Sequence, residues 1–175
     1  MIEAARIILA PFANDRSREW PEANFQRFIE RGLQEGRRYE VLGTLSQRPM
    51  ADSLVRPYSA DKVTNLCGVI PWPEVKAKLS SAAFVVANNS GLAHVSAALG
   101  QWTLCVFSGR HSWIEWMPRG PRVVTLTKAL SCSPCSLGSE RCHNGVACMT
   151  DFGPAEVFWC FNYARSSVAT LAASG

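Results

Sequence analysis

The residues best suited to chemistry follow one strongly apolar stretch. Val85–Gly100 (VVANNSGLAHVSAALG) passes from an apolar strand pattern through a polar turn into an alanine-rich helix pattern. A helix N-terminus presents unpaired N–H groups and the positive end of the helix dipole, so it attracts anions. Gly91 lets a phosphate reach the backbone, Ser90 offers a hydroxyl, and His94 lies one turn further on. The segment predicts a phosphate site. The simpler interpretation is that Ser90 caps the helix and His94 packs in the core.

A second cluster of residues that could do chemistry is rich in cysteine. Four of the seven cysteines fall in one stretch with Ser, Pro and Gly. They are Cys132, Cys135, Cys142 and Cys148. A C-x-x-C pair and two later thiols suit a tetrahedral metal site, with zinc as the default ion and iron as its competitor. Such a metal would be structural, because four protein ligands leave no open position. Disulfides and unligated thiols remain alternatives, and His143 is an alternative ligand.

The other three cysteines lie inside apolar segments. They are Cys67, Cys105 and Cys160, and we predict that they pack in the core. Free thiols favour a reducing compartment, which together with the absence of a signal-peptide pattern predicts a cytoplasmic protein.

Apolar runs alternate with helical spacing along the chain. Strands are predicted at Ala5–Phe12, Tyr39–Leu42, Val63–Val69, Ala82–Ala87, Trp102–Phe107 and Arg122–Leu126. Helices are predicted after Pro21, at Pro49–Val55, after Pro73, at Ser90–Leu99 and at residues 154–170. This order indicates an α/β fold, a Rossmann-like, mostly parallel sheet with helices on both faces. Ligands of such sheets bind at the carboxyl ends of the strands.

Composition limits the remaining classes. The 175 residues suit a single domain, 1–175, with a cysteine-rich finger at 131–149. Hydrophobic residues make up 47% and charged residues 18%, which predicts a folded chain. The net charge of +4 is scattered and too small to indicate nucleic acid. No apolar run approaches the roughly 18 residues of a membrane span.

Three motifs in order resemble glycosyltransferase family 9, the bacterial heptosyltransferases. The family hallmark is an apolar strand, Asp-Ser/Thr-Gly-x-x-His and an Ala-rich helix, similar to the segment around Ser90. Arg18-Glu19-Trp20-Pro21 is similar to its basic-x-Trp-Pro, and Asn65-Leu66-Cys67-Gly68 to its Asn-Leu-x-Gly. The matches run from about Ile7 to Val157. The resemblance implies the C-terminal, donor-binding half of a GT-B fold.

The resemblance also implies roles for individual residues. Asn14 and Arg18 would approach the diphosphate, Ile70 would touch the nucleobase, and a last group would hold diphosphate and sugar. This last group is Asn89, Ser90, Gly91 and His94. Arg18 would act in catalysis by stabilising the departing nucleotide, whose negative charge suits a fixed guanidinium. Without the family, a solvated arginine is the alternative.

The chain departs from the family in two places. The family's hallmark carboxylate is Asn89 here, and its glutamate after the second strand has no match in Gly43–Gln47. The resemblance implies a nucleotide-sugar donor, ADP-heptose in the best-known members, and transfer to lipopolysaccharide core or protein. It implies a structural metal in the finger, as in the family's protein-glycosylating branch, and no organic cofactor.

The expected partners follow from the hypothesis that the chain is the donor-binding half of a GT-B fold. They are the donor and an N-terminal acceptor half, without which the chain alone would be inactive; a peripheral place at the inner membrane is left open, as is the oligomeric state.

The aromatic segment His111–Pro118 could stack a sugar on Trp113 or Trp116, fill an interface, or pack as an ordinary loop. The rival hypothesis is a non-catalytic metal-finger binding or assembly module with a Rossmann-like core.

Overall fold

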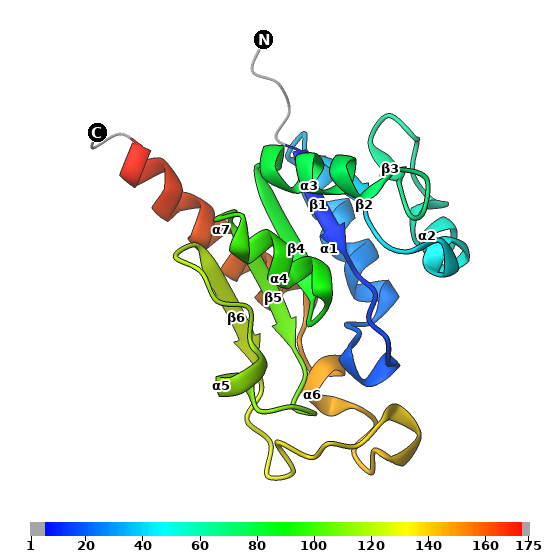
Figure 1. Cartoon of the computed structure of the whole chain (residues 1–175), viewed down its shortest axis with the longest axis vertical. Helices are drawn as coiled ribbons and strands as arrows, with labels where there is room; N and C mark the ends of the chain where they lie inside the picture. The colour runs from blue at the N-terminus through cyan, green and yellow to red at the C-terminus, as the bar shows by residue number, and fades with distance from the viewer. Residues whose placement is uncertain (1–5, 173–175) are drawn as a thin grey trace.

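Six parallel strands form the centre of the protein. The computed structural model describes the backbone of residues 6–172 and the side chains of residues 6–164. The strands are β1 (Arg6–Ala10), β2 (Arg38–Val41), β3 (Val63–Asn65), β4 (Phe84–Asn88), β5 (Thr103–Phe107) and β6 (Val123–Thr127). They pair in the order β3-β2-β1-β4-β5-β6, all parallel (Figure 1). This is the Rossmann order, so the predicted α/β class is confirmed.

Helices connect the strands. They are α1 (Glu22–Gln34), α2 (Arg48–Val55), α3 (Trp72–Ser81), α4 (Gly91–Ala98), α5 (Trp113–Trp116), α6 (Ala147–Thr150) and α7 (Pro154–Ala172). Short 3-10 turns lie at Arg16–Arg18, Leu45–Gln47 and Ser139–Arg141, labelled η1, η2 and η3. Proline occupies the first turn of α2 and α3, where its missing N–H costs nothing. In the part of the chain that the structure describes, no helix is long and apolar enough to cross a membrane.

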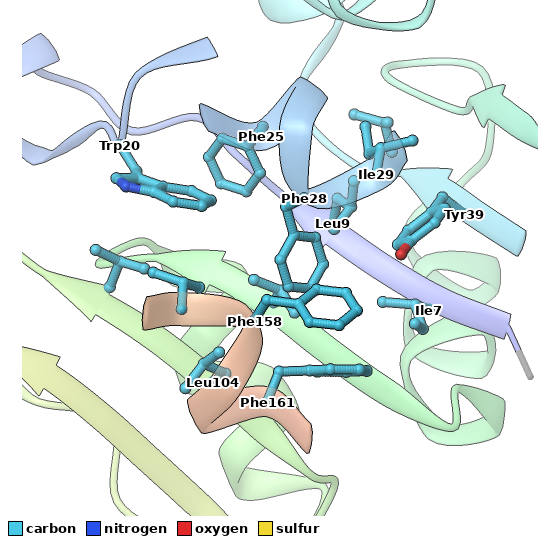
Figure 2. Packing of buried hydrophobic residues seen from close by; sticks show 14 of the residues in the cluster. Ile7, Leu9, Trp20, Phe25, Phe28, Ile29, Tyr39, Leu104, Phe158 and Phe161 are labelled. Atoms are coloured by element: carbon cyan, nitrogen blue, oxygen red, sulfur yellow. The ribbon is translucent and has the colours of Figure 1, made fainter. Parts of the chain in front are cut away.

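One face of the sheet packs against α1, α2 and α7. Alternate strand residues such as Ile7 and Leu9 point to this face, as the two-residue period of a strand requires. Phe28 of α1 meets Phe158 and Phe161 of α7 edge to face, with ring centroids 5.4 and 5.5 Å apart (Figure 2). The helical spacing predicted for the C-terminal helix therefore serves to cover this face.

The opposite face packs against α3 and α4. Ile8 and Ala10 of β1 lie here with Leu79 of α3 and Ala93 of α4. Small side chains on α4 bring this helix close to the sheet, and Ala97 is buried with Ala93. Ala98 is exposed and takes no part in this contact. The reason is angular, because a residue next to Ala97 lies about 100° around the helix.

Two expectations need correction. The strand expected at Val63–Val69 ends at Asn65, because the chain turns at Gly68, whose φ of +68° is the left-handed region. Cys67 and Cys105 are fully buried as predicted, whereas Cys160 is only half-buried on α7. All seven cysteines are free thiols.

Candidate functional site

Segments that leave the carboxyl ends of five strands meet at one edge of the sheet. The strands are β1, β2, β3, β4 and β5, and because they are parallel their ends share one side of the molecule (Figure 1). Two cavities open there, of about 470 and 230 Å³. Both cavities are lined by Arg18, Ser90 and Gly91, so they adjoin at the N-terminus of α4.

The larger cavity is lined by both apolar and polar residues. Phe12, Leu42, Ile70 and Val75 contribute apolar surface. Asn14 and Arg18 line the same cavity, together with Ser90 and Gly91. A planar apolar group with a charged tail fits this distribution, because its ring meets aliphatic and aromatic carbon while its charge meets Arg18 and α4.

The smaller cavity continues past the start of α4. Asn89 and His94 line it, together with His111 and Trp116 from the segment after β5. The rings of His111 and Trp116 are 6.1 Å apart between centroids, at a tilt of 47°. The seven residues that the family resemblance assigns to the donor thus divide between these two adjoining cavities.

The turn into α4 leaves the Ser90 hydroxyl without a hydrogen bond to other described residues and leaves open space beside Gly91. Ser90 is the N-cap residue by position, but its side chain makes no capping hydrogen bond. Its Oγ is buried and has no hydrogen-bond partner among the described residues. A Cβ built at Gly91 would meet no atom within 4 Å, which leaves the backbone open on that side. The interpretation of Ser90 as a simple side-chain cap is therefore wrong, and the anion site at this helix N-terminus stays a prediction.

The surroundings of both histidines at the site favour the neutral imidazole. Partial burial lowers the pKa of His94. Burial lowers the pKa of His111 as well, and the positive charges of Arg110 and Arg18 act in the same direction. Neutral imidazole can donate one hydrogen bond and accept another, which suits contact with hydroxyl groups.

Trp20 anchors the loop that carries Arg18. The indole is fully buried, and its Nε1–H donates to the carbonyl oxygen of Phe152 at 2.8 Å. The backbone N–H of Trp20 donates to Asn88 Oδ1 at 3.0 Å, and Asn88 Nδ2 donates to the carbonyl of Pro11 at 2.5 Å. The motif Arg18-x-Trp-Pro therefore combines the Trp20 anchor with an arginine that lines both cavities. Arg18 Nε is buried without a hydrogen-bond partner among the described residues.

The loop after β2 approaches the larger cavity without an acidic side chain. Gln47 lines the cavity, and its Oε1 accepts a hydrogen bond from the backbone N–H of Thr44 at 2.9 Å. A Cβ at Gly43 would come within 3.0 Å of Cys67 Sγ and 3.2 Å of Phe12, so the chain passes close to its neighbours. The Gln47 amide contributes no charge to the cavity.

The cysteine-rich finger lies beside the same edge, but its thiols do not converge. Burial raises the pKa of Cys148, and the neighbouring Cys142, Cys135 and Cys132 add to this effect. The backbone N–H of Val146 donates to Cys142 Sγ at 3.2 Å. Within residues 6–172, no three His, Cys, Asp or Glu side chains form a group that could hold a metal ion. The metal therefore stays a prediction.

The fold and the paired cavities define a class of protein. A parallel sheet in this order, with cavities at the start of α4, is a Rossmann-like half-domain, and ligands of such sheets bind at the carboxyl edge. Residues 2–144 match the family described as glycosyltransferase family 9 (heptosyltransferase). The chain belongs to this family, and it is one half of a GT-B fold. No curated protein sequence matches it.

Solved structures show the same fold at low sequence identity. Escherichia coli ADP-heptose lps heptosyltransferase II is 17% identical, with a TM-score of 0.80 over 97% of this chain and 49% of that one. A family 9 glycosyl transferase from Veillonella parvula DSM 2008 is 14% identical, with a TM-score of 0.78 over 94% and 46%. The dodecameric iron-containing heptosyltransferase TibC in complex with ADP-D-beta-D-heptose is 15% identical, with a TM-score of 0.72 over 95% and 47%. The chain thus spans about half the length of these proteins.

Proposed function

We propose that this chain binds the nucleotide-sugar donor of a glycosyltransferase. The observation that carries the proposal is the pair of adjoining cavities, which share Arg18, Ser90 and Gly91. A nucleoside fits the larger cavity against Ile70, the diphosphate fits the shared residues, and the sugar fits the smaller cavity beside His94. This linear order matches the order of base, diphosphate and sugar in the donor.

The shared residues suit the charge of a diphosphate. The N-terminus of α4 supplies unpaired N–H groups, Ser90 supplies a hydroxyl, and Arg18 supplies a guanidinium. When the sugar leaves, negative charge grows on the diphosphate, and Arg18 stabilises it in the transition state. Asn89 brings an amide to the sugar where the family has a carboxylate, so this chain places one negative charge fewer beside the phosphates.

We infer ADP-heptose as the donor and lipopolysaccharide core or a protein as the acceptor. Family membership supports this choice, as do related structures that contain ADP or ADP-D-beta-D-heptose. Transfer requires a second half-domain to bind the acceptor, because the solved relatives are about twice as long as this chain. The proposal places donor binding and sugar transfer in the cytoplasm, where the free thiols stay reduced.

Calorimetry tests donor binding directly. ADP, GDP, UDP and ADP-heptose are titrated into the chain, and the series is repeated with Ser90→Ala and His94→Ala. We expect ADP and ADP-heptose to bind best, S90A to weaken both, and H94A to weaken ADP-heptose more than ADP. Absence of binding by every nucleotide would refute the proposal.

We further propose that the finger binds a structural metal. Its four thiols form a soft donor set that suits zinc or iron, and Val146 N–H donates to Cys142 Sγ in the way that stabilises thiolates. Cys132, Cys135, Cys142 and Cys148 would hold the ion, which would cross-link a loop with few large apolar residues. An iron-containing relative supports this assignment.

Elemental analysis tests the metal. Protein purified without chelator should contain about one zinc or iron per chain, and Cys135→Ser should lose it. Cys160→Ser is the matched control, because Cys160 lies on α7 outside the finger. A metal content far below one per chain would refute this proposal while leaving donor binding untouched.

A further inference from the structure

Arg110 joins the segment after β5 to the loop after β1. Its Nη1 lies 2.5 Å from Asp15 Oδ2 and donates to Ser17 Oγ at 3.3 Å. The two partners are more than ninety residues away in the sequence, and both belong to the loop that carries Arg18. The contact therefore fixes one loop of the donor site against another.

Asp15 transmits this contact within its own loop. Its Oδ1 accepts hydrogen bonds from Ser17 N at 2.8 Å and from Ser17 Oγ at 2.6 Å, which caps η1 (Arg16–Arg18). Arg18 is the last residue of that turn. The hydrogen bonds from Ser17 and the charge of Arg110 hold the pKa of Asp15 well below its usual range, so the carboxylate is ionised at neutral pH.

The cysteine-rich finger holds the other side of Arg110. Ser136 N donates to the carbonyl of Arg110 at 2.8 Å, and Cys135 N donates to the carbonyl of Gly109 at 3.3 Å. Gly109 is buried so closely that a Cβ would lie 2.2 Å from Ser133 Oγ and 3.2 Å from Cys148 Cβ. The finger thus fixes the backbone from which Arg110 extends.

The finger also touches the Arg18 loop directly. A Cβ built at Gly138 would come within 3.2 Å of Asp15 Oδ2. Finger, Arg110 and Asp15 form one continuous set of contacts, and it ends at the turn that bears Arg18. Arg110 is absent from the linings of both cavities, so the described geometry gives it no direct role in either.

We propose that Arg110 is a positioning residue through which the cysteine-rich finger sets the place of Arg18 in the donor site. The proposal rests on the donor site proposed above. It assigns the finger a function in phosphate binding, because displacement of the finger would release Arg110, then Asp15, and then the turn before Trp20. Leu42, Ile70 and Val75, which line the larger cavity, take no part in this set of contacts, so the surface that we propose for the nucleoside should stay intact.

Comparison of ADP with adenosine tests this coupling, because only ADP carries the phosphates that Arg18 contacts. Arg110→Ala should weaken ADP about tenfold, since a misplaced guanidinium loses most of a charged hydrogen bond. Adenosine affinity should not change. Arg110→Lys keeps a positive charge beside Asp15 and should restore part of the loss.

A double-mutant cycle separates positioning from general damage. In the Arg18→Ala background, Arg110→Ala should cause no further loss of ADP affinity, because its effect passes through Arg18. Additive losses, or an equal loss for adenosine, would overturn the proposal, as would an R110A variant with wild-type ADP affinity. Asp15→Asn should repeat the R110A result.

The finger side is tested at Gly109. Gly109→Ala drives a methyl group against Ser133 and should weaken ADP without affecting adenosine; adding Ser133→Ala removes the closest atom and should recover part of the affinity. No recovery, together with normal thermal unfolding of both variants, would contradict the coupling.

If wild-type protein binds no ADP, the donor proposal itself fails. If it binds ADP and only R18A weakens binding, only the coupling fails.

Discussion

Gly91→Ala should separate ligand binding from stability. Gly91 is the first residue of α4, and a Cβ built on it meets no atom within 4 Å. Alanine therefore fits without strain, and its lower unfolded-state entropy should stabilise the fold by about 0.4–1 kcal/mol. The new methyl group points into the space that a phosphate needs, and losing one charged hydrogen bond costs about 1.5–3 kcal/mol. ADP affinity should therefore fall about tenfold to a hundredfold.

The assay pairs calorimetric titration of ADP with urea unfolding. Gly100→Ala is the matched control, because Gly100 ends the same helix region in open space with a φ of +71°. Alanine in that left-handed region costs about 1–2 kcal/mol, so G100A should lose stability and keep its ADP affinity. A G91A variant that binds ADP like the wild type would refute the phosphate site at α4.

Three further changes test other parts of the molecule. Trp116→Ala should weaken ADP-heptose about tenfold and leave ADP unchanged, because Trp116 lines only the smaller cavity; Trp113→Ala, on the same helix but outside both cavities, should change neither. Asp15→Asn should destabilise the protein at pH 7, and its difference from the wild type should shrink progressively as the pH falls below about 4. A carboxyl with a lowered folded pKa stabilises fully above its unfolded pKa and loses this contribution as the pH falls towards its folded pKa, so a difference that is constant from pH 7 to pH 3 would contradict this. Phe28→Ala should cost about 3–5 kcal/mol in urea unfolding, since Phe28 is fully buried between α1 and α7, and a cost below 1 kcal/mol would show that α7 does not pack there.

The alternation of strand and helix could be predicted from sequence because buried parallel strands are continuously apolar. β4 and β5 are buried along their whole length and match the predicted runs closely. The strand at Val63 was predicted too long, because Leu66–Val69 is apolar for a different reason. There the backbone N–H groups of Leu66 and Gly68 donate to the carbonyls of Val41 and Gly43, and the chain turns at Gly68.

The candidate site was predictable where a motif is local. Ser90, Gly91 and His94 lie within five residues of one another, so helix geometry alone relates them. The contact between Arg110 and Asp15 was not predicted, since it joins segments that meet only when β1 and β5 end at the same edge. Asn88 was missed in the same way, because an asparagine at the end of a strand does not reveal that it tethers Trp20 and Pro11.

In the sequence, His111 is distinguished only by its aromatic neighbours. Its place in the smaller cavity follows from how the segment after β5 turns back towards α4, which no pattern in the sequence records. The cysteine spacing was visible from the start, but spacing does not fix where the sulfur atoms lie. Their positions depend on the turns at Ser136 and Val146, both with positive φ.

A crystal structure of this chain with ADP tests the central claim most directly. The account predicts the β-phosphate at the N-terminus of α4, within hydrogen-bond distance of the Gly91 backbone N–H and the Arg18 guanidinium, and the adenine against Ile70. ADP bound at any other place on the molecule, with the α4 N-terminus left to solvent, would contradict it.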